Sequence, residues 1–132
     1  MKHTSLTLLA CIMLASAARS ETPTVPAEAK QLSGAEIGAW LDGKSLSVEI
    51  FDAGVPVTAT TNWDLTGQRI SGDFVANGEK GTFDNEWIIK GDTSCAEKSA
   101  EGDWICQKIF VLGDVMYEVT KKGKLHAVST VK

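Results

Sequence analysis

Hydrophobic and polar residues alternate with a period of two over most of the chain that follows Gly43. Such alternation is typical of β-strands that bury one face and expose the other. It begins at 46–50 and is clearest at 57–65, where Val, Ala, Thr, Trp and Leu alternate with polar residues. The same pattern predicts further strands at 69–76, 81–90, 104–112, 115–121 and 124–131.

Short glycine-containing turns separate several of these strands, at Asn77-Gly78, Gly113-Asp114 and Lys122-Gly123. Glycine and asparagine accept the positive φ of a tight hairpin, and strands joined in this way pair antiparallel. A sheet of this size has to hide one face and both edges. We therefore predict a mainly β fold: an antiparallel meander of about seven strands, curled into a small barrel or half-barrel, with one short N-terminal helix.

The predicted helix has clear boundary signals. Ser33 and Glu36 form a Ser-x-x-Glu capping box, and Gly43 provides a C-terminal stop. A short amphipathic helix is expected over 34–42, with Trp40 packed against a larger element.

The first 20 residues have the layout of a secretory signal peptide. Lys2 is followed by the apolar run 6–14, and Ala15-Ser16-Ala17 offers small residues for cleavage. Lipidation at Cys11 is an alternative, but the apolar run continues beyond that residue. We expect a signal peptide at 1–20, a proline-containing flexible arm at 21–31 and a single small β domain at 32–132.

Charge changes this picture little. The whole chain has a formal net charge of −4, and loss of 1–20 would make it two units more negative, because Lys2 and Arg19 leave and no acid does. An acidic surface repels nucleic acid and anionic membranes. We therefore expect neither nucleic-acid binding nor membrane insertion after signal cleavage, and a periplasmic or secreted location.

Two cysteines, Cys95 and Cys106, remain after removal of the signal segment. In an oxidising compartment a lone pair of cysteines predicts a disulfide. Zinc binding by the pair would need further ligands, and His126 is the one histidine that remains.

Catalytic motifs are lacking. His126 is predicted on a strand face with Val128 and Thr130, a position typical of a surface or packing residue. Neither a Gly-x-Ser-x-Gly elbow nor a phosphate-binding glycine loop occurs. We expect no catalytic residue, no metal site and no cofactor, and therefore a protein that is not an enzyme.

The aromatic residues have two interpretations. Trp63, Phe83, Trp87 and Tyr117 are in phase with aliphatic neighbours, which predicts core positions, but a ligand cavity would give the same pattern. The strand at 104–112 is apolar on both faces. Ile105, Ile109 and Val111 are expected to point inward, while Trp104, Phe110 and Leu112 point outward, under the helix or into a partner. The candidate ligand- or partner-binding residues are therefore Trp63, Trp87, Trp104, Phe110 and Tyr117.

A run of short motifs between Trp63 and Gly123 resembles a known family. The motifs are Gly72-Asp73-Phe74, Gly81-Thr82-Phe83, Trp87, Gly91-Asp92 and Cys95, then Cys106, Gly113-Asp114 and Tyr117. Together they resemble a domain-of-unknown-function family of small exported proteins from rhizobia and other alphaproteobacteria. This resemblance implies a small exported domain and transfers no activity.

A second, fainter similarity is to secreted bacterial inhibitors of metalloproteases, which are disulfide-bearing β-barrels with an N-terminal arm. It rests on Gly91-Asp92-Thr93-Ser94-Cys95 and on the segment before Leu32. The expected function is an exported, non-catalytic, lipocalin-like binding module for a small apolar ligand or a protein partner. The alternative is an inhibitor of a secreted or host hydrolase that inserts 21–31 or a hairpin loop into the active site.

Overall fold

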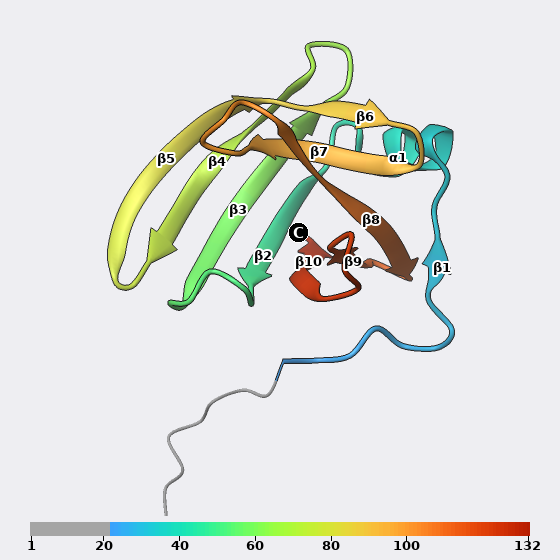
Figure 1. Ribbon diagram of the computed structural model, residues 1–132, viewed down its shortest axis with the longest axis horizontal. Helices are drawn as coiled ribbons and strands as arrows, with labels where there is room; N and C mark the ends of the chain where they lie inside the picture. Colours follow the sequence, from blue (N-terminus) through green and yellow to red (C-terminus); the bar gives the residue numbers. More distant parts are fainter. Residues whose placement is uncertain (1–21) are drawn as a thin grey trace, which may run out of the picture.

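The structure is a computed structural model that describes residues 22–132. The predicted signal segment 1–20, with Cys11, lies outside the described residues. Within 22–132 one helix accompanies a single antiparallel sheet that curls into a half-barrel (Figure 1). The predicted fold class is confirmed. The helix is α1 (Gly34–Leu41), and the strands are β1 (Lys30–Gln31), β2 (Ser45–Ile50), β3 (Val57–Asp64), β4 (Arg69–Ala76), β5 (Glu79–Glu86), β6 (Ile88–Lys90), β7 (Thr93–Lys98), β8 (Trp104–Leu112), β9 (Val115–Val119) and β10 (Leu125–Val131).

The strand order explains how the sheet closes on itself. Neighbours follow the path β5-β4-β3-β2-β10-β9-β8-β7-β6, while β1 pairs with β8 off this path. The two ends of the path, β5 and β6, are consecutive in the chain and separated by Trp87 alone. One long bent segment therefore pairs with β4 through its first half and with β7 through its second half (Figure 1).

The sheet has ten strands, three more than the sequence pattern predicts: β1, β6 and β7. The predicted strand 81–90 breaks at Trp87, and the polar segment 91–103, for which the sequence pattern predicts no strand, contains β7. Strand β7 has few apolar residues, but it pairs with both β6 and β8, and Cys95 lies opposite Cys106. These two cysteines form the predicted disulfide.

Helix α1 closes one end of the half-barrel. The capping box of Ser33 and Glu36 is present, and Gly43 has a φ of 77°. Ile37 and Leu41 are fully buried, whereas Trp40 is half-buried beside Lys44. The docking residues of the helix are therefore mainly aliphatic.

The helix packs on β6 and β7, so the expectation that it covers the outer face of β8 is wrong. The helix contacts Ile89 through Gly38, and its first N–H, on Gly34, donates to the carboxylate of Asp92. Two other expectations for β8 are confirmed, because Ile109 is fully buried and Val111 packs against the core. Ile105 does not point into the core and is 40% exposed.

The segment before the helix is attached to the sheet at its end. Lys30 and Gln31 form β1 opposite Val111 and Phe110, and the N–H of Leu32 donates to the carbonyl of Ile109. The last two residues of the predicted arm therefore form part of the sheet.

Candidate functional site: a cavity inside the half-barrel

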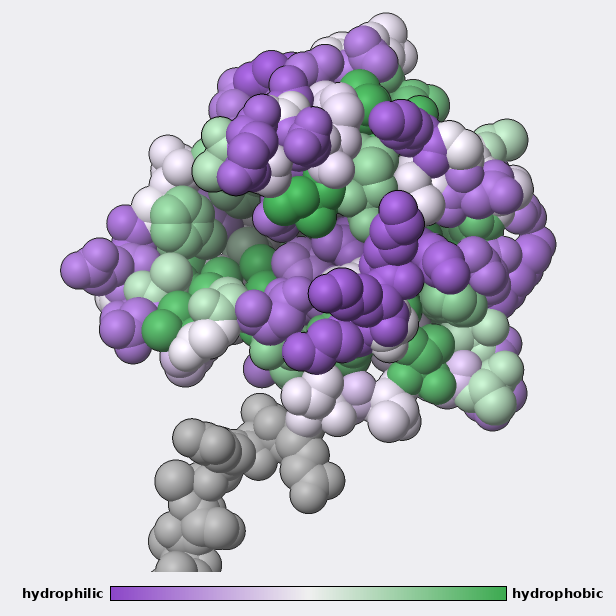
Figure 2. Space-filling view, in the orientation of Figure 1, coloured by the Kyte–Doolittle hydropathy of each residue, from purple (hydrophilic) through white to green (hydrophobic). Residues whose placement is uncertain are grey.

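A cavity of about 230 Å³ lies on the inner face of the curled sheet. Its wall comes mostly from inward-facing residues of β2, β3, β4 and β5, with contributions from β7, β9 and β10. Figure 2 shows apolar surface deep in the hollow of the sheet, bordered by hydrophilic residues. The side chains around it are Val48, Ile50, Val57, Ala59, Thr61, Trp63, Ile70, Phe74, Phe83, Asn85, Ala96, Glu97, Glu118, His126 and Ala127.

Two phenylalanines shape the wall together with the glycines opposite them. Phe74 pairs with Gly81 and Phe83 pairs with Gly72 across the β4–β5 ladder. A Cβ on Gly81 would collide with the Phe74 ring, and a Cβ on Gly72 would collide with the backbone of Thr60 and approach Phe83. The glycines therefore leave room for two rings whose centroids are 6.5 Å apart.

Trp63 and Trp87 fill the interior next to the cavity. Their rings meet edge to face with centroids 4.9 Å apart, and both are buried. Each indole N–H is already bonded, that of Trp63 to the Thr61 hydroxyl and that of Trp87 to the Ser94 hydroxyl, both at 2.9 Å. The space between the two tryptophans is therefore packed, and the hollow lies on the far side of Trp63.

Two β-bulges bring polar groups to this cavity. In β10 the pairing with β9 shifts between Leu125 and Ala127, which leaves His126 as the extra residue. In β7 the pairing with β8 shifts between Cys95 and Glu97, which leaves Ala96 as the extra residue. A bulge re-aims side chains that strict alternation would send to the other face. His126 thus lines the cavity together with its neighbour Ala127.

His126 lies between two carboxylates. Its Nδ1 is 2.6 Å from Oδ1 of Asp52, and its Nε2 is 3.4 Å from Oε1 of Glu97. Burial disfavours the charged ring, but the contacts with Glu97 and Asp52 and the charge of Glu118 outweigh it and raise the pKa of His126 to about 9. The contact with His126 lowers the pKa of Glu97. The ring is therefore a cation held at the rim of the cavity.

Glu118 completes the group, which we call the carboxylate–histidine cluster (Asp52, Glu97, Glu118 and His126). Its side chain extends inward from β9 and the residue is 8% exposed. Burial, together with the negative charges of Glu97 and Asp52, raises the pKa of Glu118 to about 7 despite the opposing charge of His126. Its carboxyl receives no hydrogen bond among residues 22–132. The cavity therefore contains a carboxyl group to which none of these residues donates a hydrogen bond.

The chemistry open to the cluster is limited by its geometry. Both ring nitrogens of His126 face carboxylates, so neither is in contact with a hydroxyl or thiol that it could activate. Among residues 22–132 no three His, Cys, Asp or Glu side chains are arranged to hold a metal ion. Within the same range no helix is both long and apolar enough to cross a membrane.

The five residues proposed from the sequence do not form one site. Trp63 and Trp87 lie together, and Trp63 lines the cavity. Trp104 does not line the cavity but lies in an adjacent hollow near Glu86, with the Lys98 ammonium 4.5 Å above its ring. Phe110 and Tyr117 face each other across the β8–β9 ladder, half-buried on the side away from Ile109 and Met116.

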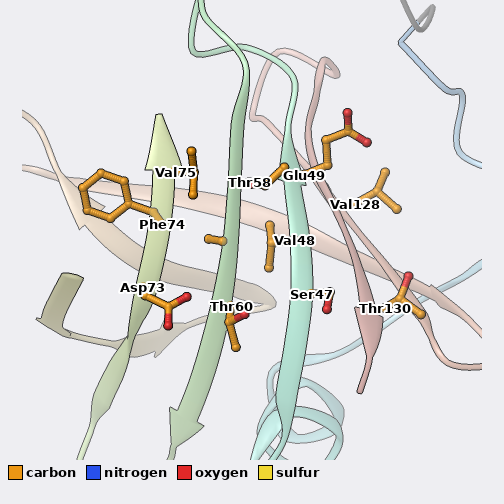
Figure 3. A pocket seen from close by; sticks show the side chains of 11 residues that line it. Ser47, Val48, Glu49, Thr58, Thr60, Asp73, Phe74, Val75, Val128 and Thr130 are labelled. Carbon is orange, nitrogen blue, oxygen red and sulfur yellow. The ribbon is translucent and has the colours of Figure 1, made fainter. Parts of the chain in front are cut away.

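Two open grooves lie outside the half-barrel. Figure 3 shows one of them on the outer face of β2–β4 and β10, where Ser47, Glu49, Thr58 and Thr60 extend from the strands. The second borders the rim of the cavity, shares Ile50, Glu97 and His126 with it, and adds a series of lysines. These are Lys90, Lys108, Lys121, Lys122 and Lys124.

The cluster does not follow from the sequence pattern, because strict alternation places His126 on the face of Val128 and Tyr117 on the inward face of its strand. In β9 the inward residues are Met116 and Glu118. The one available signal was the strand Val115–Val119 itself, in which Glu118 is the single charged residue and shares its face with Met116, so that either phase would bury an apolar residue. A glutamate in such a strand can therefore be an inward-facing residue.

No protein-family model matches the chain, and no curated protein or solved structure matches it either. The similarity to the exported family of unknown function stays a prediction.

Proposed function

We propose that the chain is an exported, non-catalytic binding module whose ligand is a small, largely apolar molecule held inside the half-barrel. The observation that carries the proposal is the cavity on the inner face, with apolar walls and a few polar groups at its rim. Small-molecule sites generally combine a concave apolar surface with a few polar groups that orient the ligand. A volume of about 230 Å³ lies below the range of about 300–1,000 Å³ usual for drug-sized ligands, which favours a smaller one.

The disulfide supports export, because such bonds persist in oxidising compartments such as the periplasm or the extracellular medium. The engagement of both His126 nitrogens by carboxylates supports a binding role over catalysis.

The alternative, an inhibitor that inserts its N-terminal segment into a hydrolase, has less support. Because Lys30 and Gln31 pair with β8, only the residues before them extend freely enough for insertion. A protein partner could also bind the outer face around Phe110 and Tyr117, but these two residues are half-buried and provide a small contact area.

The experiment is a melting-temperature screen with small apolar compounds (indole, cyclohexanol and 2-phenylethanol) on the wild type and two matched variants. Ala59→Leu extends a side chain into the cavity, whereas Thr58→Leu places the same side chain on the outer face of the same strand. A bound ligand stabilises the fold by mass action. We expect stabilisation of the wild type and of Thr58→Leu but not of Ala59→Leu. Equal responses of the two variants, or no response of the wild type, would contradict the proposal.

A further inference from the structure

Glu118 is the least expected group in the cavity. A buried carboxyl is costly unless it is hydrogen-bonded or paired. Glu118 is 8% exposed, lines the cavity and receives no hydrogen bond among residues 22–132. A group in this position is available to a molecule that enters the cavity.

The balance of charge around the cavity is negative. Three carboxyl groups, those of Asp52, Glu97 and Glu118, surround one imidazole, and within 22–132 no lysine or arginine lines the cavity. The two nitrogens of His126 face Asp52 and Glu97, so Glu118 is the carboxyl left over. A cation inside the cavity would satisfy it.

The aromatic wall favours the same charge. Trp63, Phe74 and Phe83 line the cavity, and the faces of aromatic rings attract cations. Their edges and the aliphatic residues between them suit an apolar body.

We propose that the cavity takes a ligand with a protonated amine on a small apolar body, and that the ammonium group is bound by the Glu118 carboxylate. This inference rests on the proposed binding function and names the class of its ligand. Charge pairing with Glu118 provides the polar part of recognition, and burial against Phe74 and Phe83 provides the apolar part. The elevated pKa of Glu118 fits this role, because a bound cation would stabilise the ionised form and lower that pKa.

The test compares three probes of the same shape at pH 8 by isothermal titration calorimetry: phenethylamine, 2-phenylethanol and phenylacetate. A hydrogen bond to a charged group discriminates by about tenfold or more, so the wild type should bind phenethylamine at least about tenfold more tightly than 2-phenylethanol. In Glu118→Gln this preference should disappear while 2-phenylethanol still binds. Glu49→Gln, which makes the same charge change on the outer face of β2, should behave like the wild type.

A second measurement does not depend on a variant. In the wild type the preference for the amine should weaken as the pH falls from 8 to 5.5, because Glu118 becomes protonated. The carboxyl carbon shift of Glu118, followed by NMR, should titrate at a lower pH with phenethylamine than with 2-phenylethanol.

The possible failures are distinguishable. If 2-phenylethanol binds as tightly as phenethylamine, or if Glu118→Gln keeps the preference, the amine inference is overturned and the binding function stands. Tightest binding of phenylacetate would also overturn it, because the lysines of the neighbouring groove would then provide recognition. If none of the three probes binds, the proposed function falls and the inference with it.

Discussion

His126 of β10 and Glu118 of β9 line the same cavity because His126 is the extra residue of a β-bulge. Without the bulge, alternation along β10 would send His126 to the outer face with Val128. The bulge places a protonated ring beside a buried carboxyl. The charge of Glu118 raises the pKa of His126, and the charge of His126 lowers the pKa of Glu118. The polar end of the cavity therefore depends on an irregularity in one strand.

This pair makes the stability of the fold depend on pH. The folded-state pKa of Glu118 is about 7 against an ordinary 4.5, and that of His126 is about 9 against 6.5. In both cases the folded state holds a proton that the unfolded chain would release, so stability falls as the pH rises through these intervals. Each step amounts to about 3 kcal/mol.

The measurement is urea unfolding at pH 5, 7 and 9. Wild type should lose stability from pH 5 to 7 and again from 7 to 9. Glu118→Gln should remove most of the first step, and Glu49→Gln on the outer face should leave it unchanged. Glu97 acts in the opposite direction, because its lowered pKa contributes stability that is lost only as the pH falls below 4.5. If the wild type gains stability between pH 5 and 7 relative to Glu118→Gln, the folded-state pKa of Glu118 is not raised.

Two glycines test how the cavity wall is built. Gly81→Ala forces the Phe74 ring to move, which is possible by rotation, so we expect a cost of about 1 kcal/mol and weaker ligand binding. Gly72→Ala meets the backbone of Thr60, which cannot rotate away, so we expect about 3 kcal/mol or more. The check is thermal unfolding of both variants. No loss of stability in Gly81→Ala would show that the Phe74 ring does not lie on Gly81.

Much of the fold could be predicted from the sequence, because alternation, hairpin turns and the capping box are local signals. The pattern of 57–65 and the Ser33–Glu36 box predict β3 and the start of α1. Strand β7 could not be predicted, because its residues are mostly polar and it is held by pairing with strands on both sides.

The candidate site was harder to predict than the fold. Trp63 was one of five candidates for which the sequence left core packing and cavity lining open. The polar end of the cavity depends on contacts between residues far apart in the chain, such as Asp52 with His126. Bulges at Ala96 and His126 reverse the expected faces, and nothing in a binary pattern marks them. Alternation with a period of two therefore predicts where most strands lie, but it does not predict the bulges at which a strand departs from alternation.

The disulfide provides a third prediction. Cys95 and Cys106 join neighbouring strands and close a short loop, which should contribute about 2–3 kcal/mol by restricting the unfolded chain. Cys95→Ser and Cys106→Ser should lower the free energy of unfolding by similar amounts, and reductant should act on the wild type in the same way. Two free thiols titrated in protein recovered from an oxidising compartment would contradict the pairing.

Deletions in the N-terminal segment distinguish the binding function from the inhibitor function. Deletion of 22–29 removes the part of the predicted arm that precedes β1, and we expect the fold and cavity binding to persist. Deletion of 22–31 also removes β1 and the Lys30–Glu36 ion pair, so a lower melting temperature is expected. The functional readout is a panel of secreted proteases and lysozymes. If the undeleted protein inhibits one of these enzymes and deletion of 22–29 abolishes that inhibition, the inhibitor function is favoured.

Intermolecular NOEs report whether a small molecule binds inside the half-barrel. With 2-phenylethanol bound to protein carrying labelled methyl groups, we expect NOEs from the ligand to the methyls of Val57, Ala59 and Ala127, which line the cavity. The methyls of Thr58, Val75 and Val128, on the outer face, should show none. NOEs to these outer methyls instead of the inner ones would contradict binding inside the half-barrel.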